Sequence, residues 1–180
     1  MRNVSKAFSL YDFNLLVSCS WGAHHGARAE IIRLLKRLGD EHPLVKHTPA
    51  KGLIGVRTVL PAREVTKGLR AMVAEDPSLL YHTRKWVPVD LWTRSDIDSM
   101  KEAVMEIRDR IKDGETWRMT VEKRRYTACH RIEIIKVLAE LIGAKVDLDH
   151  PDKILRIDLI GRYAAISVLT PEEIFSLAFP

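Results

Sequence analysis

A run of basic residues marks the second half of the sequence. Between positions 118 and 136, six Lys and Arg residues stand against two Glu residues, a local charge of +4. The six are Arg118, Lys123, Arg124, Arg125, Arg131 and Lys136. Guanidinium groups bind phosphate through paired hydrogen bonds and stack on nucleobases. The run therefore predicts a site for a polyanion such as RNA, although the same charges are also compatible with ordinary solvated faces of a strand and a helix.

Residues beside this run strengthen the RNA interpretation. Cys129, His130 and Arg131 stand at the start of a predicted helix, where backbone N–H groups and the helix dipole favour phosphate. Tyr126 or His130 is a candidate to stack on an unpaired terminal base. A second basic pair, Arg84 and Lys85, falls near the middle of the chain and is expected to extend the same surface.

Sequence motifs of enzyme sites are missing. The chain contains no Gly-rich phosphate loop of the Walker type, no GxGxxG after a strand, and no GxSxG, HExxH or CxxC. The adjacent His24 and His25 lack further ligands at metal-binding spacing, and Cys129 lacks a partner base. We therefore predict no metal, no cofactor and no catalytic activity.

Composition limits the class of protein. The chain has 180 residues, a net charge of +5 and two cysteines, too few for a disulfide scaffold. No apolar run is long enough to span a membrane. Residues 1–85 carry 14 Lys and Arg against 7 Asp and Glu, or +7, while residues 86–180 carry 15 against 17, or −2. A cytoplasmic protein with a basic first half is expected.

The first half has the pattern of a ferredoxin-like domain, expected over residues 1–85. Residue types predict strands at 13–19, 44–47 and 53–59, helices at 27–38 and 61–75, and an extended segment at 79–92. This split βαβ order places two helices on one face of a four-stranded antiparallel sheet.

The second half, residues 86–180, has an α/β pattern. Ser95 is expected to be the N-cap of a helix that Gly114 closes. An alternating strand at 116–123, a helix at 131–142 and two apolar strands at 154–160 and 164–169 follow. Because no Gly, Ser or Pro linker separates the halves, we predict an α+β protein of two domains packed together.

Two stretches of the chain resemble a known family. Residues 114–125, GETWRMTVEKRR, resemble the "GETFRV…KRR" strand of THUMP domains, with Trp117 where the family often has Phe. Residues 146–148, 151–152, 154–161 and 165–169 then continue in the family order. Residues 13–31 resemble the "LLVTC…G…A..EI" opening of the ferredoxin-like domain that accompanies THUMP in standalone adaptor proteins for tRNA acetylation.

This resemblance implies a tRNA-binding module without an activity of its own. Such a protein grips the acceptor stem and the unpaired 3′ end and presents the tRNA to a separate acetyltransferase that forms N4-acetylcytidine. The expected RNA contacts are Arg84, Lys85, Arg118, Lys123, Arg124, Arg125, His130, Arg131 and Lys136. Three alternatives remain open: a small RNA-acting enzyme, an RNA-binding subunit for a different tRNA modification, and a protein-interaction domain with incidental basic charge.

Overall fold

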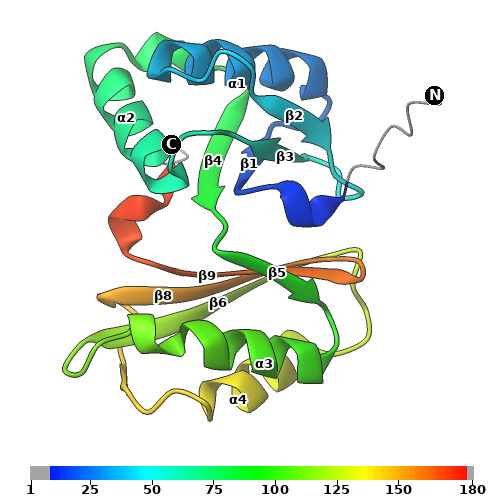
Figure 1. Ribbon diagram of the computed structural model, residues 1–180, viewed down its shortest axis with the longest axis vertical. Coiled ribbons are helices and arrows are strands. Elements are labelled where there is room, and N and C mark those ends of the chain that lie inside the picture. The colour runs from blue at the N-terminus through cyan, green and yellow to red at the C-terminus, as the bar shows by residue number, and fades with distance from the viewer. Residues whose placement is uncertain (1–8, 178–180) are drawn as a thin grey trace, which may run out of the picture.

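Two five-stranded sheets face each other, and each carries its own pair of helices on its outer face (Figure 1). The computed structural model describes residues 9–177. Along its longest axis the order of layers is helices, first sheet, second sheet, helices. The fold is therefore α+β, with a ferredoxin-like domain packed against an α/β domain, as the sequence predicts.

The first sheet has the strand order β10-β4-β1-β3-β2 and is antiparallel throughout. Its strands are β1 (Leu15–Cys19), β2 (Leu44–His47), β3 (Leu53–Arg57), β4 (Thr83–Pro88) and β10 (Phe175–Ser176), and its helices are α1 (His24–Leu38) and α2 (Ala62–Glu75). Gly39 ends α1 with φ 111°, a conformation that favours glycine. Four of these strands match the predicted ferredoxin-like order, and β10 adds a fifth at the edge.

Alternation along β1 builds two separate cores. Leu15 and Val17 are buried against α1 and α2, whereas Leu16 points to the opposite face, toward the second sheet. Phe13 joins Leu16 there and packs against Gly55 of β3. A Cβ atom at Gly55 would collide with the Phe13 ring, so the glycine allows this close approach.

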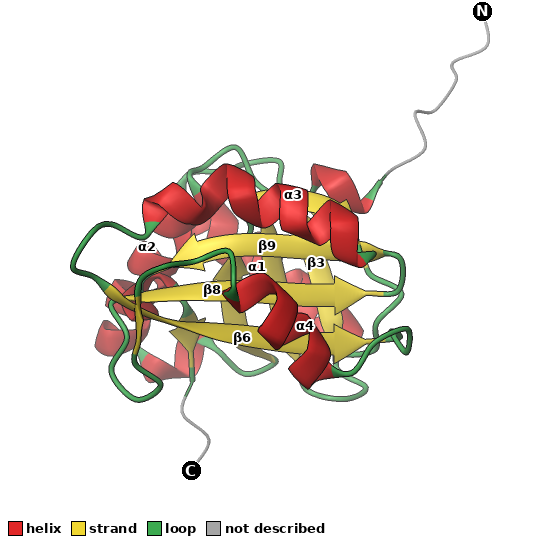
Figure 2. Cartoon of the chain, turned by 90° about the horizontal axis from the view of Figure 1, so that it is seen from below, coloured by secondary structure: helices red, strands yellow, loops and turns green. Residues whose placement is uncertain are grey.

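The second sheet has the strand order β5-β9-β8-β6-β7. It consists of β5 (Leu91–Arg94), β6 (Thr116–Arg124), β7 (Lys145–Val146), β8 (Lys153–Ile160) and β9 (Tyr163–Leu169). β6 runs parallel to β7 and β8, and the other pairs are antiparallel. Helices α3 (Ile97–Ile107) and α4 (Arg131–Ala139) lie over β9, β8 and β6 (Figure 2). They cover Trp117, Val121 and Ile157, which are almost fully buried.

The structure corrects several predicted boundaries. The extended segment at 79–92 is two strands in different sheets, because β4 pairs with β1 up to Pro88 and the chain then crosses at Val89 and Asp90. The expected division after Lys85 thus falls inside β4. Asp96, not Ser95, caps α3, since its side chain accepts a hydrogen bond from the Ser99 N–H. Helices α1 and α4 span 24–38 and 131–139 instead of 27–38 and 131–142. Helix α3 spans 97–107 and ends well before Gly114, the residue expected to close it.

Asp90 joins the two layers at this crossing point. Its side chain is 5% exposed and forms ion pairs with Arg63 of α2 at 2.8 Å and Arg110 at 2.9 Å. It also accepts a hydrogen bond from the Val168 N–H at 2.9 Å. Burial opposes ionisation of Asp90, but the bonds from Arg63 and Val168 outweigh it and lower the pKa of the carboxyl.

Two further hydrogen bonds tie the layers together. Trp92 donates its indole N–H to the Phe13 carbonyl at 2.7 Å, and the Ser167 hydroxyl donates to the Pro88 carbonyl at 2.9 Å. Contacts of this kind fix the relative position of the sheets. Within residues 9–177, no helix is long and apolar enough to cross a membrane.

Candidate nucleic-acid interface

The alternation of β6 divides the predicted basic run between two faces of the sheet. Arg118 and Arg124 point toward the first sheet, where they line cavities together with residues of β4. Lys123 points to the opposite face, with Trp117 and Val121. There it donates a hydrogen bond to the Cys129 carbonyl at 2.6 Å and lies 5.5 Å from the centre of the Tyr126 ring. Neighbours in sequence are therefore on different surfaces.

A groove between the two sheets collects basic side chains from both of them. One cavity of about 480 Å³ is lined by Arg84, Lys85, Arg124 and Arg156, among others. An adjoining cavity of about 280 Å³ shares Lys85 and Arg156 and adds Arg118. We call this surface the basic groove, defined by Arg84, Lys85, Arg118, Glu122, Arg124 and Arg156.

A buried carboxylate fixes two of the arginines. Asp158, which is 3% exposed, accepts hydrogen bonds from Arg124 at 2.8 Å and from Arg156 at 2.7 and 3.1 Å. Glu122 is the other carboxylate among the residues that line these cavities or pair with them. Five basic groups against two acidic groups leave an excess of three positive charges in the basic groove.

Lys85 and Arg118 have properties that bear on anion binding in the basic groove. Burial, followed by the nearby positive charge of Arg156, lowers the pKa of the Lys85 ammonium. The Arg118 Nε–H is buried and has no hydrogen-bond partner among the described residues, although Nη1 of the same side chain donates to the Leu148 carbonyl. A buried donor without an acceptor is costly, so an incoming anion would relieve that cost.

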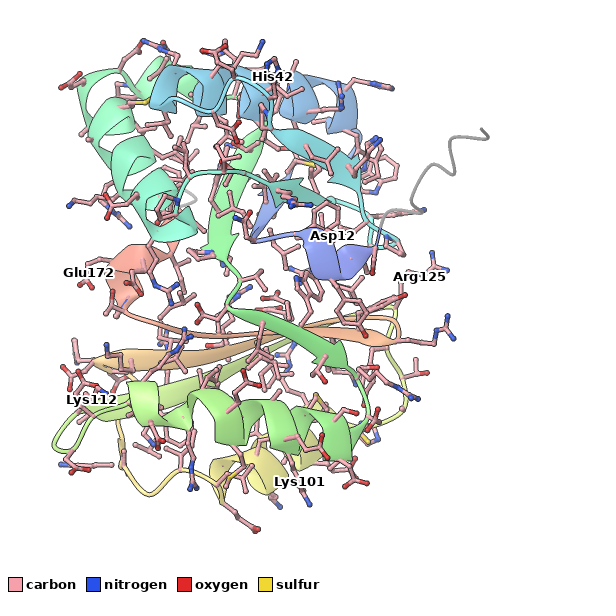
Figure 3. All side chains as sticks on the ribbon, viewed as in Figure 1. Asp12, His42, Lys101, Lys112, Arg125 and Glu172 are labelled. Atoms are coloured by element: carbon pink, nitrogen blue, oxygen red, sulfur yellow. The ribbon has the colours of Figure 1, made fainter. Side chains whose placement is uncertain are left out.

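The remaining predicted contacts lie outside the basic groove. Arg131 and Lys136 are exposed on α4, in the outer helix layer, and His130 is the exposed N-cap residue before it. Glu133 accepts a hydrogen bond from the His130 N–H at 2.9 Å. A phosphate at this helix start would meet that carboxylate. Arg125 follows β6 with φ 54° and donates to the Pro49 carbonyl at 3.3 Å. Figure 3 shows Arg125 at one edge of the molecule, near the level where the two sheets face each other.

Tyr126 differs from its expected role as a stacking platform. The ring is half-buried and packs against the core of the second domain. Burial and a hydrogen bond with Cys129 raise its pKa to about 12. A ring held in this way offers little open surface to a base.

Arg156 is the basic-groove residue that sequence reasoning missed. It lies in β8, whose sequence KILRIDLI is interpreted as an apolar strand because five of its eight residues are Ile or Leu. The signal was present, because Arg156 and Asp158 are spaced by two and so share one face of the strand. A charged pair at that spacing indicates a polar face inside the protein.

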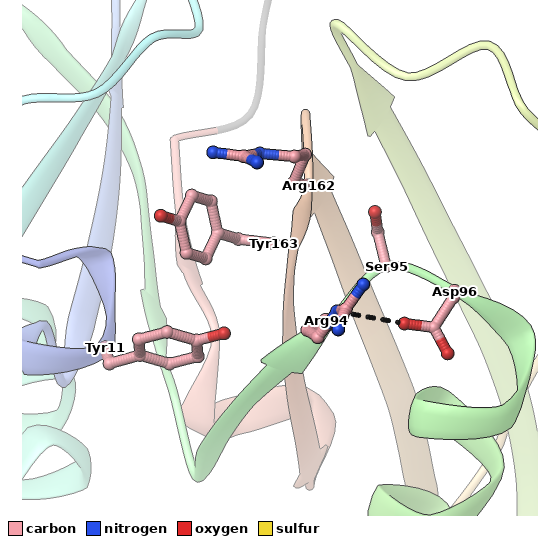
Figure 4. Close-up of a pocket in the computed structure, with 6 residues that line it drawn as sticks. All are labelled: Tyr11, Arg94, Ser95, Asp96, Arg162 and Tyr163. Carbon is pink, nitrogen blue, oxygen red and sulfur yellow. Dashed lines mark ion pairs between the residues drawn. The ribbon is translucent and has the colours of Figure 1, made fainter.

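A different hollow of about 440 Å³ lies at the end of β5 and the turn before β9 (Figure 4). Tyr11 and Tyr163 meet there edge to face, with ring centres 5.2 Å apart. Arg94 forms an ion pair with Asp96 at 3.4 Å. Among residues 9–177, no group of three or more His, Cys, Asp or Glu side chains is arranged to hold a metal ion.

Comparisons with solved structures show how widely this architecture occurs. PH1313 from Pyrococcus horikoshii matches 88% of this chain and 55% of its own with a TM-score of 0.61 and 12% identity. TrmN from Thermus thermophilus matches 86% and 44%, with a TM-score of 0.57 and 15% identity. A 4-thiouridine synthetase in complex with RNA and ATP matches 91% and 42%, with a TM-score of 0.54 and 13% identity.

The low identity and partial coverage of these matches limit the conclusion to the fold. Identities this low show a common fold, and the chain spans about half the length of the structures it matches. No curated protein matches the sequence significantly. Residues 94–169, less than half of the chain, match the profile of the THUMP domain. The segment from the end of β5 to the end of β9 is therefore a THUMP domain, packed here against a ferredoxin-like domain.

Proposed function

We propose that this protein is a non-catalytic tRNA-binding protein that holds the acceptor stem and the unpaired 3′ end and presents the tRNA to a separate modification enzyme. The basic groove carries the proposal. Its five basic groups come from both domains, so an RNA strand lying there would contact the ferredoxin-like and THUMP domains together. Neither domain alone provides this arrangement.

The groups in the basic groove suit phosphate. Asp158 holds Arg124 and Arg156 in place, which reduces the entropy lost when a ligand binds. Lys85 is partly desolvated, and no carboxylate within ion-pair distance neutralises it among the described residues. A phosphate between these groups would gain charge-assisted hydrogen bonds in a site partly shielded from water.

The match of residues 94–169 to the THUMP domain favours tRNA, through the family resemblance described above, and one matched structure holds an RNA. A structure that shares this fold over 91% of the chain is a 4-thiouridine synthetase bound to RNA. The finer assignment to N4-acetylcytidine formation, with a separate acetyltransferase as partner, rests on the resemblance of residues 13–31 to the ferredoxin-like domain of the adaptor proteins. The resemblance of residues 114–125 is to THUMP domains in general. A subunit for a different tRNA modification is the second candidate, because the matched structures are not all of one kind.

Binding to three RNAs tests the proposal: a whole tRNA, the same tRNA without its unpaired 3′ nucleotides, and a plain duplex of equal length. We expect the whole tRNA to bind most tightly. Equal, salt-sensitive binding to all three would contradict recognition of the acceptor end, and no binding would contradict the function itself. Modification of tRNA by the purified protein alone would show that it is an enzyme.

The choice of partner needs a separate measurement. A tRNA acetyltransferase is assayed with and without this protein, and N4-acetylcytidine in the product is quantified. We expect acetylation to depend on the added protein. If acetylation is the same without it while tRNA binding is normal, the protein serves a different modification.

A further inference from the structure

Two aromatic side chains are unusually exposed where the turn after β1 lies beside the segment before β4. Trp21 is 87% exposed and Tyr81 is 76% exposed. The other three tryptophans of the chain are covered: Trp86 and Trp117 are at most 2% exposed, and Trp92 is half-buried. A large aromatic surface left in water forgoes the stabilisation that burial gives the others, and exposed aromatics of this size often mark binding sites.

The exposed pair adjoins the basic groove. Trp21 and Tyr81 line a cavity of about 710 Å³ that also includes Ser20 and Arg84. Ser20 and Arg84 line the 480 Å³ cavity of the basic groove as well. Arg84 Nε donates to the Ser20 hydroxyl at 3.2 Å, at the boundary between the two cavities. The hollowed surface thus continues from the basic groove to the two aromatic rings.

Buried interactions fix the backbone that carries these rings. Glu30, which is 4% exposed, accepts hydrogen bonds from the N–H groups of Tyr81 and His82 at 2.8 and 3.0 Å. It also accepts bonds from the N–H and hydroxyl of Thr83 at 2.9 and 2.7 Å. The Ser20 N–H donates to the His82 carbonyl at 3.1 Å, which ties the Trp21 turn to the Tyr81 segment. Open rings on a fixed backbone are suited to stacking.

We propose that Trp21 and Tyr81 form a stacking platform for unpaired bases of the RNA strand whose phosphates lie in the basic groove. This inference rests on the proposed function and adds the residues that would recognise the single-stranded end. The change from cations to aromatic rings along one surface is the pattern of single-strand binding sites, in which charge holds the backbone and rings hold the bases. Arg84 stands at the transition and would contact the phosphate nearest the stacked base.

Tryptophan fluorescence tests the platform directly, because Trp21 is the one strongly exposed tryptophan in the chain. We expect whole tRNA to quench the emission of the wild-type protein. The same tRNA without its unpaired 3′ nucleotides should bind more weakly and leave most of that emission unquenched. A variant with Trp21→Phe should keep most of the affinity and lose the signal.

Affinity measurements complete the test. Trp21→Ala should weaken binding to whole tRNA by about tenfold, since stacking on a ring contributes on this order per base, and should leave binding to the trimmed tRNA unchanged. Tyr11→Ala, in the separate hollow of Figure 4, is the matched control and should change neither affinity. Circular dichroism checks that each variant is folded.

The outcomes separate this inference from the proposed function. If whole tRNA binds tightly but Trp21→Ala binds it equally well and no quenching occurs, the platform is wrong and the basic groove stands. Equal loss of affinity for whole and trimmed tRNA would also overturn the platform, because it would place Trp21 against paired RNA. If wild-type protein binds neither RNA, both proposals fail.

Discussion

The two faces of β6 both carry basic residues, but the surroundings of those residues differ. On the face toward the first sheet, Arg118 and Arg124 meet Arg84 and Lys85 across the basic groove. On the helix side, Lys123 donates a hydrogen bond to the Cys129 carbonyl within the same domain. Arg131 and Lys136 lie exposed on α4. Both sides carry basic residues, but among the described residues only on the side toward the first sheet do basic side chains from two domains line the same cavities.

This difference shows that a basic run in a sequence does not locate a binding surface by itself. A strand sends alternate residues to opposite faces, so half of any such run is directed away from the other half. Convergence needs a second element, here β4 of the other sheet. Variants of the basic groove are therefore expected to differ from variants of the helix side in stability, RNA affinity and salt dependence. Equal effects on RNA affinity would remove the basis of the proposed function.

The largest difference is expected in stability. Asp158→Asn leaves Arg156, which is 5% exposed, without its carboxylate partner. Breaking a buried ion pair in this way should lower the free energy of unfolding by about 3 kcal/mol. On the helix side, Glu133→Gln at the exposed start of α4 should cost less than about 1 kcal/mol. Urea denaturation measures both, and equal losses would show that Asp158 is not a structural centre of the basic groove.

RNA affinity should show the next largest difference. A triple variant with Arg84→Ala, Lys85→Ala and Arg118→Ala should weaken tRNA binding by about 100-fold, because each charge-assisted contact contributes on the order of 1 kcal/mol or more. The matched helix-side variant, with His130→Ala, Arg131→Ala and Lys136→Ala, should lose less than about threefold. Filter binding at one salt concentration compares them. Similar losses would mean that overall charge, not the basic groove, attracts the RNA.

The dependence of binding on salt sharpens the same comparison. Each phosphate contact contributes about 0.7 to 0.9 to the slope of log K against log salt. The basic-groove variant should therefore reduce this slope by roughly 2 to 3 units. We expect the helix-side variant to leave the slope almost unchanged. Titrations at several salt concentrations provide the slopes, and an unchanged slope in the basic-groove variant would contradict direct phosphate contacts.

The smallest expected effect is a pH dependence that comes from Lys85. Its pKa lies below the ordinary 10.5, so its ammonium loses its proton earlier than other lysines as the pH rises. Since the protonated form binds phosphate, tRNA affinity should fall between neutral pH and 10.5, by a few-fold at most. Lys85→Arg keeps its charge over this range and should remove the fall. A fall of equal size in that variant would assign the effect to another group.

Much of the fold could be predicted from the sequence because local patterns determine it. Alternation from Trp117 to Arg124 correctly divides β6 into a buried face and a polar face. The order of elements in the first half gives the ferredoxin-like sheet. The change of sheets within the extended segment at 79–92 was missed, although Pro88 and Asp90, which are unfavourable inside a strand, flank Val89. That signal marks a break in the strand but does not say that the next strand joins another sheet.

The candidate site was predictable in part for the same reason. The guanidinium groups of Arg118 and Arg124 predicted phosphate binding. Whether their face of β6 contacts solvent or another sheet depends on how the domains pack, which the sequence does not show. Arg156 was hidden in an apolar strand, and Trp21 stood in a turn where no periodicity describes it. Residues that act through tertiary contacts leave little trace in the local pattern.

The ion pairs of Asp90 bear on the rate of ligand association and on its entropic cost. Arg63, Arg110 and the Val168 N–H are all bonded to this one buried carboxylate, so the two sheets that enclose the basic groove are held together in the absence of any ligand. We therefore expect binding in the basic groove to need no closing motion, with a rate set by electrostatic attraction between the partners. Because the two domains are already held together, we also expect binding to cost little interdomain conformational entropy.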